Sequence, residues 1–331
     1  MTALPCCCPK IRPSLTQTAA PVRYRFLVRW KSYALVGLLV ALLAGGCSIK
    51  KYAINKVGDA LASGESVYET DEDPDLVGEA LPFALKLTES LLAESPNHRG
   101  LLLTACRGFA LYSYGYVDFA GEVAMEEDLD RGRALRTRAR RLYLRGLNYC
   151  LRGLERDHAG FREGLLTRPR ETALLVSGKR ERWDVPFLYW TAASLGLAVS
   201  VSKGDASMLA RLPEVEALLD RALEIDDDWD DGSLHEFRVS LEAAKPGDPD
   251  VEAITKHYER ALQLSGGHRA GIFIAYAEAV AIPAQKREQF QELIERALAI
   301  DPDSRPNDRL ANLLAQRRAR WLLGRIDELF L

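Results

Sequence analysis

The residues that could carry catalysis or bind a metal ion are few in this chain, and they are widely separated. Its histidines are His98, His158, His235, His257 and His268, and no two of them have the spacing of paired metal ligands. The pair His235 and Glu236 is similar to the start of a zinc-protease motif, but Val239 stands where the second histidine would be needed. The sequence also lacks a phosphate-binding loop, a dinucleotide glycine fingerprint and a nucleophile elbow. We therefore predict no catalytic residue, no metal site and no cofactor, and we expect a protein that is not an enzyme.

An acidic run is the other place where side-chain oxygens gather, and it could in principle bind calcium. Its members are Asp226, Asp227, Asp228, Asp230 and Asp231. The run lacks the glycine and the terminal glutamate at the spacing that a calcium loop requires. We interpret it as an acidic turn at the boundary between two helices.

Six cysteines look plentiful until their positions are considered. Cys6, Cys7 and Cys8 lie at the start of the chain and Cys47 follows an apolar run, so only Cys106 and Cys150 lie in the body. Both body cysteines fall on predicted helices. They could form a disulfide bond if their Cα atoms lie about 5.5 Å apart, or they could be small buried hydrophobic residues. The sequence leaves both interpretations open.

The composition is that of a folded protein without a strong overall charge. The chain has 331 residues, 47% of them hydrophobic, and a formal charge of −3. It can bury a sizeable core in one or two domains, and a near-neutral balance gives no overall attraction for nucleic acid. The most basic stretch, residues 131–154, keeps its leucines at helical spacing. Because Glu122 and Glu126 lie just before this stretch, we interpret it as a solvated, acid-paired helix face and predict no nucleic-acid partner.

The N-terminus predicts export from the cytoplasm. Residues 10–31 carry only positive charges, and residues 33–46 form an uncharged apolar run of 14 residues. Such a run is too short to cross a bilayer comfortably and is typical of the core of a signal peptide. We predict a signal peptide over residues 1–46, and an uncleaved short membrane anchor is the alternative. A misassigned start codon would explain the unusual length of the basic segment.

The apolar run ends in LAGGC, residues 43–47, which resembles the lipobox of bacterial lipoproteins. The resemblance implies that Cys47 is acylated and becomes the new N-terminus. Acyl chains would then hold the protein at the membrane, because each buried methylene contributes about 0.8 kcal/mol. Residues 47–70 are predicted to be a lipidated linker. By analogy with lipoprotein sorting, Ser48 favours the outer membrane.

A repeated helix ending organises the second half of the chain. It occurs as LDRALEIDDDWDDG, YERALQLSGGHRAG and IERALAIDPDSRPN, with Ala222, Ala261 and Ala297 at equivalent positions 39 and 36 residues apart. This spacing is typical of stacked helix-turn-helix repeats. No run of alternating β-branched residues interrupts the pattern. We therefore predict an all-α fold of stacked antiparallel helix pairs over residues 71–331, a degenerate tetratricopeptide-like (TPR-like) α-solenoid.

The first strong amphipathic helix of the body is predicted to begin at Asp73 and Pro74. Its apolar positions recur at spacings of three and four: Leu76, Ala80, Phe83, Leu87 and Leu91. The most apolar stretch of the body is residues 183–201. Its 19 residues include Pro186, and we interpret it as a buried central helix rather than a membrane span.

Aromatic and polar residues supply the candidates for a binding groove or pore. The aromatic candidates are Trp183, Phe187, Tyr189, Trp190 and Tyr276, and the polar candidates are Arg107, His235, Glu236 and Glu278. A ligand site is typically apolar with a few placed polar groups. The alternative is that the aromatic residues only fill the core.

Several long segments in order resemble the T-component (TatT) family of tripartite ATP-independent periplasmic (TRAP) transporters. They are ALPFALKLTESLLAESPNHRGLLL, DVPFLYW, DDGSLHEF, ALQLSGGHRAGIFIAYAEAVAIPAQ and LANLLAQRRARWLLGRIDELFL, within about residues 77–331. The resemblance implies a lipid-anchored periplasmic protein that forms a homotrimer around a central pore. It also implies a periplasmic substrate-binding protein as partner and a small hydrophobic ligand. An envelope-assembly scaffold that uses the same groove for protein is the alternative function.

Overall fold

A computed structural model describes residues 50–62, 67–180 and 182–330. The chain divides into a unit of residues 1–52 and a unit of residues 53–331. Of the first unit only residues 50–52 are described, and they belong to a helix of residues 50–62. The predicted signal peptide and the predicted acylation site, Cys47, lie outside the described residues. The predictions about them stay predictions.

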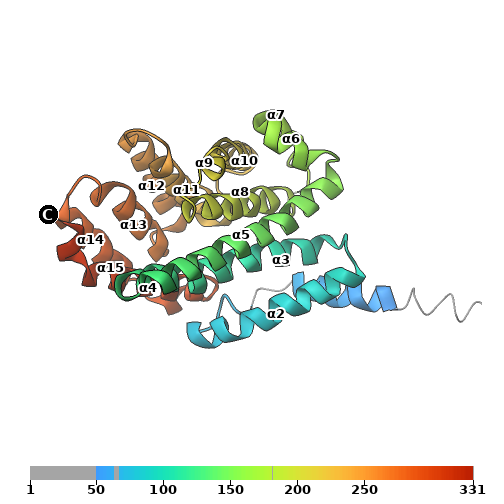
Figure 1. Ribbon diagram of the computed structural model, residues 1–331, viewed down its shortest axis with the longest axis horizontal. Helices are drawn as coiled ribbons and strands as arrows, with labels where there is room; N and C mark the ends of the chain where they lie inside the picture. The colour runs from blue at the N-terminus through green and yellow to red at the C-terminus, as the bar shows by residue number, and fades with distance from the viewer. Residues whose placement is uncertain (1–49, 63–66, 181, 331) are drawn as a thin grey trace, which may run out of the picture. The chain divides into compact units, whose positions relative to one another are not determined.

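The described part of the unit 53–331 consists of helices and turns, with no β-strand, which confirms the predicted all-α fold (Figure 1). The first series is α2 (Pro74–Glu94), α3 (Arg99–Tyr112), the π-helical turn η1 (Ser113–Asp118), α4 (Phe119–Glu127), α5 (Leu129–Asp157), α6 (Phe161–Thr167), α7 (Pro169–Ala173), α8 (Asp184–Ser200), α9 (Ala206–Leu209) and α10 (Leu212–Ile225). The second series is α11 (Trp229–Ala244), α12 (Val251–Ser265), α13 (Ala270–Tyr276), the π-helical turn η2 (Ala277–Ala281), α14 (Arg287–Leu298), the 3₁₀ turns η3 (Pro302–Ser304) and η4 (Pro306–Asp308), α15 (Arg309–Gly324) and α16 (Ile326–Leu329).

Aspartate side chains cap the start of several helices. Asp73 accepts hydrogen bonds from the second and third residues of α2, and Pro74 takes the first position of that helix. Asp128 and Asp250 cap α5 and α12 in the same way. A side-chain oxygen at this position satisfies backbone N–H groups that have no partner within the helix. The predicted start of the helix at Asp73 and Pro74 is therefore confirmed.

The first core, defined by the buried cluster from Leu85 to Leu241, gathers around α5. This helix of 29 residues packs against α3, α4 and α8 (Figure 1). At Gly153 a Cβ atom would lie 2.2 Å from the Phe187 ring, so only glycine allows α5 and α8 to approach this closely. The predicted central helix corresponds to α8, whose residues are mostly buried. No helix among the described residues is both long and apolar enough to span a membrane.

The second core, defined by the buried cluster from Val239 to Phe330, gathers α11 to α16. The equivalent alanines of the repeated ending are all fully buried, Ala222 in the first core and Ala261 and Ala297 in the second. Their helices α10, α12 and α14 end within a few residues of them, as the turn signals predicted. A TPR-like solenoid remains a prediction.

Helix α15 returns to the first helices of the unit. Arg317 pairs with Asp75 of α2 at 2.9 Å. The Trp321 Nε1–H donates to the Glu126 carboxylate of α4 at 2.7 Å, and the Trp321 ring meets the Phe119 ring edge-on. The end of the helix series therefore closes against its beginning.

Helix α2 differs from the expectation drawn from its apolar spacing. Its buried residues are Val77, Leu85, Thr88 and Leu92. Three members of the predicted stripe are instead exposed: Leu76 by 56%, Phe83 by 74% and Leu87 by 42%. The helix is apolar on two faces, so periodicity could not decide which face meets the core.

Three arginines of α5 pair with acids that are not the ones just before this helix in sequence. Arg136 pairs with Asp118, Arg140 with Asp205 and Arg145 with Glu89. The nearby acids Glu122 and Glu126 instead pair with residues of α15 and Arg325.

Candidate functional site

Five partly accessible side chains from five different helices come together where the two cores meet. We call them the inner cluster: Tyr114 of η1, Tyr189 of α8, Glu236 of α11, Glu278 of η2 and Arg318 of α15. Glu278, Glu236 and Arg318 act on the pKa of Tyr114, and Tyr114 and Glu236 act on the pKa of Tyr189, so the five residues lie within electrostatic reach of one another. Two members lie in the π-helical turns, a rare backbone form that is frequent at functional sites.

Arg318 ties the two cores together at this cluster. Its guanidinium donates to both Glu278 carboxylate oxygens, at 2.7 and 3.3 Å, and to the Glu122 carboxylate. Burial alone would lower the pKa of Arg318, but Glu278, Tyr114 and Glu122 hold it well above its ordinary value. Bidentate pairing of this kind fixes the geometry of the acceptor. Glu278 is therefore held in one orientation.

Tyr114 is surrounded by protein and still accessible. About half of its side chain is exposed, 49%, although it lies among η1, α4, α11 and α15. Burial raises the pKa of its hydroxyl to about 12, with Glu278, Glu236 and Glu122 adding to the rise and Arg318 opposing it. A side chain that has protein on several sides and is still half exposed to solvent is expected on a recessed surface. The hydroxyl stays protonated and can donate a hydrogen bond to a ligand.

Glu236 is the member without a fixed partner. The hydrogen bonds and ion pairs of the described residues include none to its carboxylate, which lies against Gly271, where a Cβ would come within 2.4 Å of it. Burial raises the pKa of this carboxyl, Asp230 and Asp308 raise it further, and Arg269 opposes them. A carboxyl group with a raised pKa can exchange a proton or accept a hydrogen bond from a ligand.

Tyr189 supplies an aromatic wall beside Glu236. Its ring centroid lies 4.9 Å from that of Trp190, 4.8 Å from that of Trp229 and 6.1 Å from that of Phe237. Burial raises the pKa of the Tyr189 hydroxyl, and Glu236 and Asp230 add to the rise. The inner cluster thus combines an aromatic surface with a few polar groups, which is the composition of a small-molecule site.

A strained turn lies next to the inner cluster, at the start of α11. Asp230, Asp231 and Gly232 are consecutive residues with positive φ at the start of α11. Arg269 donates to the Asp230 carbonyl at 2.8 Å and to the Ser233 hydroxyl, and Arg305 pairs with Asp231 at 2.7 Å. Left-handed backbone at aspartate persists only when its surroundings hold it. These arginines neutralise the acidic run, so the predicted acidic turn is observed, and the described residues contain no group of ligands suited to a metal ion.

The structure brings some of the predicted site residues together and separates the others. Tyr189, Glu236 and Glu278 belong to the inner cluster, and Trp190 touches it through Tyr189. The other predicted residues lie elsewhere: Trp183 between the guanidiniums of Arg99 and Arg182, Phe187 in the first core, Tyr276 stacked on Tyr258 in the second core, Arg107 paired with Glu69, and His235 between α11 and α12.

Three residues around the cluster were not among the predicted site residues. Tyr114 was part of an ordinary helical pattern, and Arg269 followed a turn, so neither was distinctive in sequence. Arg318 is one of several arginines of α15, and nothing in its local sequence distinguishes it from the others. Its partners Glu122 and Glu278 lie 196 and 40 residues away along the chain. Only the closure of the helix series against its beginning reveals such contacts.

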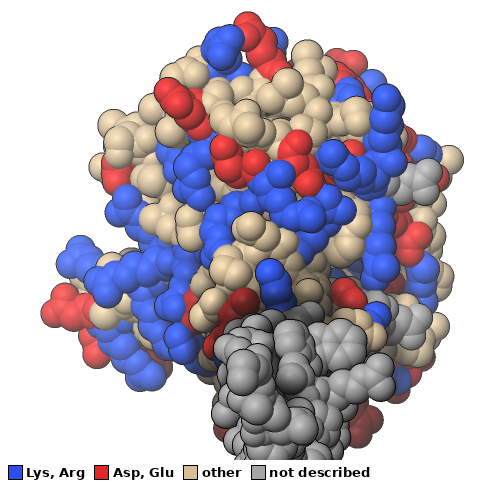
Figure 2. Space-filling model, turned by 90° about the vertical axis from the view of Figure 1, so that its right-hand side faces the viewer, with Lys and Arg blue, Asp and Glu red and all other residues tan. Residues whose placement is uncertain are grey.

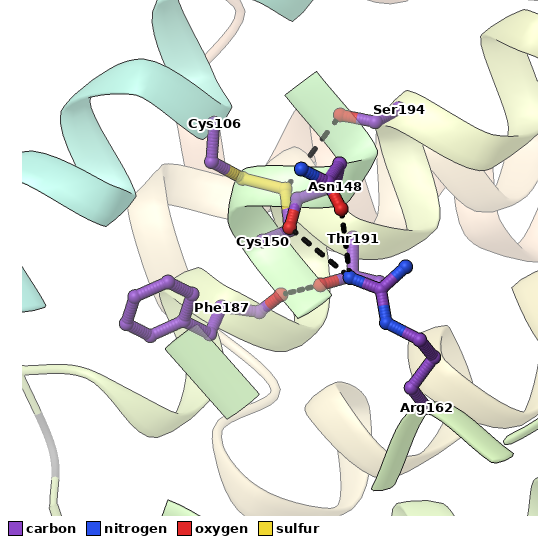
Figure 3. The surroundings of a disulfide bond; sticks show 7 residues. All are labelled: Cys106, Asn148, Cys150, Arg162, Phe187, Thr191 and Ser194. Atoms are coloured by element: carbon purple, nitrogen blue, oxygen red, sulfur yellow. Dashed lines mark hydrogen bonds between the residues drawn. A yellow bond between two sulfur atoms is a disulfide. The ribbon is translucent and has the colours of Figure 1, made fainter. Parts of the chain in front are cut away.

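The two body cysteines form a disulfide bond, which settles the alternative left open by the sequence (Figure 3). The bond joins α3 and α5 with a Cα separation of 5.0 Å. Both residues are fully buried. Close by, the Ser194 hydroxyl of α8 lies 3.8 Å from the Cys150 sulfur (Figure 3). Disulfide bonds persist in oxidising compartments.

Comparison with known proteins identifies the family of this chain. The sequence pattern of the family described as TRAP transporter T-component matches residues 70–330. The chain belongs to this family. A protein of Treponema pallidum (strain Nichols), described as uncharacterized, is 30% identical over 306 residues, which cover 88% of this chain and 95% of the relative. Membership makes the chain an accessory component of a TRAP transporter, as the resemblance of its segments indicated.

Proposed function

We propose that this T-component is a lipid-anchored protein of the periplasm that binds a periplasmic substrate-binding protein and holds a small hydrophobic ligand at the inner cluster. The observation that carries the ligand part is Glu236, a carboxyl group without a fixed partner among the described residues, beside the aromatic wall of Tyr189 and the accessible Tyr114. A fitting ligand has an apolar body for the wall and one or two hydrogen-bonding groups for Glu236 and Tyr114. We assign no catalytic role to any residue.

The disulfide bond supports a location outside the cytoplasm. Cytosolic reductants keep most thiols reduced, whereas the periplasm favours a structural disulfide between Cys106 and Cys150. Acylation of Cys47 supplies the anchor in this proposal, and the outer membrane is the favoured destination.

The exposed apolar stripe of α2 is the surface that we assign to the proposed homotrimer. Leu76, Ala80, Phe83 and Leu87 are spaced by four, three and four residues, which matches the seam of helices packed side by side. Copies of the same stripe can cover one another around a symmetry axis. Replacement of Phe83 by aspartate is expected to shift the mass of the purified particle, measured by light scattering, from trimer to monomer. An unchanged mass contradicts this assignment.

The ligand proposal is tested by the small molecules that remain bound after purification. Protein isolated from membranes is denatured and its extract is analysed by mass spectrometry. Substitutions Tyr189→Ala and Glu236→Lys are expected to remove a molecule that the parent chain retains. Trp183→Ala is the matched control, because this aromatic residue lies outside the inner cluster. Equal retention in all variants contradicts the site.

The partner proposal has a separate test. The acylated protein is used to capture partners from detergent-solubilised membranes, and the recovered proteins are identified. A solute-binding protein of a TRAP system is the expected partner. Recovery of envelope-assembly proteins without a solute-binding protein would favour the scaffold function instead.

A further inference from the structure

Six arginines gather at the end of the unit 53–331 where α3 begins and α5 ends. We call this surface the basic end; its members are Arg99, Arg152, Arg156, Arg162, Arg180 and Arg182. Three of them share one carboxylate, because Asp157 pairs with Arg99 at 2.7 Å, Arg156 at 3.1 Å and Arg180 at 3.8 Å. Among the described residues, the single charge of Asp157 therefore faces three guanidiniums.

Two carboxylates of this end, those of Asp157 and Asp184, are largely buried. The side chains of Asp157 and Asp184 are exposed by only 14% and 5%. Glu155 accepts hydrogen bonds from the backbone N–H groups of Gly160 and Arg162, so its charge caps the start of α6. Glu163 of α6 is the acid of this helix that faces solvent. Lys and Arg side chains consequently dominate the middle of this face (Figure 2).

Among the described residues, no carboxylate forms an ion pair with three arginines of the basic end, Arg152, Arg162 and Arg182. Arg182 contacts the Trp183 ring, and Arg152 donates to the Pro96 carbonyl, a neutral group. Arg162 uses one guanidinium nitrogen for Asn148 (Figure 3). The remaining guanidinium N–H groups of these three residues can bind an anion from outside the chain.

The N-terminal chain enters the unit at the same end. Asn55 accepts a hydrogen bond from the Ser95 hydroxyl at 2.8 Å, and Asp59 pairs with His98 at 3.2 Å. Both contacts hold residues 53–62 against the turn between α2 and α3, immediately before Arg99. Cys47 precedes Ala53 by six residues, a length that spans about 20 Å when fully extended.

We propose that the basic end faces the membrane and binds the headgroups of anionic phospholipids. The inference rests on the proposed acylation of Cys47, because an acyl anchor within about 20 Å of Ala53 keeps this end near the bilayer surface. Each arginine close to an anionic membrane strengthens binding, and the anchor raises the local concentration of lipid headgroups. The anchored unit then has a preferred orientation, with the basic end toward the bilayer.

The test uses the full acylated protein reconstituted into vesicles of phosphatidylcholine alone or mixed with phosphatidylglycerol. Hydrogen exchange is measured in the turn between α5 and α6, residues 158–160, and at the far end of α5, residues 128–133. Exchange at the first turn is expected to slow on the order of tenfold when phosphatidylglycerol is present, and exchange at the far end is expected to stay the same. At about 1 M salt the difference is expected to vanish, because charges are then screened within about 3 Å.

A matched pair of double variants separates headgroup binding from general charge. Arg162→Gln with Arg182→Gln removes two exposed arginines of the basic end and is expected to abolish the slowing. Arg131→Gln with Arg133→Gln removes two exposed arginines from the other end of α5 and is expected to leave it intact. Equal exchange at residues 158–160 in the two kinds of vesicle overturns the proposal, and so does slowing that both double variants keep. The parent chain at high salt tests the same electrostatic contribution without any substitution.

Retention on vesicles of phosphatidylcholine alone tests the anchor separately. Those vesicles offer no anionic headgroup, so retention depends on the acyl chains of Cys47. A chain that washes off them contradicts the proposed acylation, and binding through the basic end is then still decided by vesicles that contain phosphatidylglycerol.

Discussion

The first core has a disulfide bond between two of its central helices, whereas the second core is crosslinked by ionisable side chains. In the first core, Cys106 and Cys150 join α3 to α5, and glycines such as Gly153 let the helices approach closely. In the second core, shorter helices are held at their ends by Arg269 and by the pair of His235 and His257. Covalent bonds respond to reductants and ionisable contacts respond to pH. The two halves are therefore expected to fail under different conditions.

The largest expected effect is the loss of the disulfide bond. Replacement of both Cys106 and Cys150 by alanine opens a covalent loop with a sequence separation of 44 residues. Such a loop is expected to contribute about 4 kcal/mol to the free energy of unfolding. Urea unfolding followed by tryptophan fluorescence measures the loss, and hydrogen exchange should locate it in α3 and α5 rather than α12 and α13. A reductant should destabilise the parent chain but not the double variant; equal sensitivity contradicts the comparison.

The next effect concerns the strained turn of the second core. Arg269→Met keeps most of the side-chain volume but removes the donors that hold Asp230 in its left-handed conformation. The Arg269 side chain is only 17% exposed, so a loss of about 3 kcal/mol is expected from the broken, largely buried contacts. Arg305→Met is the control, because this side chain is 38% exposed and its pair with Asp231 is expected to contribute less than about 1 kcal/mol. Equal losses in urea unfolding would refute the assigned role of Arg269.

The histidine pair makes the second core sensitive to acid. His235 Nε2 lies 3.0 Å from the Asp227 carboxylate, so it carries the proton, and His235 Nδ1 accepts from His257 Nδ1 at 2.8 Å. Burial lowers the pKa of His257 to about 4, with His235 and Arg238 adding to the fall and Glu242 opposing it. Burial also lowers the pKa of His235, against the opposing Asp227. Both rings are therefore neutral at pH 7.

The sign of the resulting pH dependence follows from the unfolded chain, where a histidine has a pKa of about 6.5. The stability contributed by neutral His257 is present above pH 6.5 and is lost as the pH falls toward 4, by about 2 kcal/mol at pH 4.5. Urea unfolding at a series of pH values measures this loss. His257→Gln is expected to flatten the profile between pH 6.5 and 4.5, and His268→Gln, at an exposed position, is the control. A profile that His257→Gln leaves unchanged would exclude the pair as its cause.

The sequence could predict the helices of both cores but not which surfaces meet. The apolar spacing and the cap at Asp73 indicated α2 correctly, yet Phe83 is exposed and Leu85 is buried, because a helix with two apolar faces has no single preferred side. Periodicity describes one helix at a time, and the choice of face depends on its neighbours.

The inner cluster was predictable only in part, for a similar reason. Tyr189 lies in the apolar, aromatic stretch, and Glu236 was one of the polar candidates, next to His235. Arg318 acquires its role from Glu122, 196 residues earlier, through the return of α15 to α4. Contacts at this separation leave no local pattern in a single sequence. Disulfide pairing was undecided for the same reason, since it depends on a distance of 5.0 Å between two helices.

The smallest expected effect comes from Asp118 in the first core. Its pH dependence is opposite to that of His257, because stability falls as the pH rises. Asp118 accepts a hydrogen bond from the Tyr143 hydroxyl at 3.0 Å, and its other carboxylate oxygen is buried without a hydrogen-bond partner. Burial raises the pKa of Asp118 to about 6, with Glu122 adding to the rise and Arg136 opposing it. Because this pKa lies above the unfolded value of about 3.9, ionisation of Asp118 destabilises the fold progressively as the pH rises through 6.

Asp118→Asn removes that ionisation and still offers an oxygen to Tyr143. It is expected to raise the free energy of unfolding at pH 7 by about 1 kcal/mol, because it removes a buried charge whose cost exceeds the attraction of Arg136 at 3.5 Å. The informative quantity is the slope of the free energy of unfolding against pH. Between pH 4 and 7 the variant should lack the decline in stability that the ionisation of Asp118 causes. The loss of stability in acid that is due to His257 should remain. Urea unfolding of the two single variants and their combination measures both slopes. If Asp118→Asn and His257→Gln alter the profile in the same direction, the two cores do not respond to pH in opposite ways.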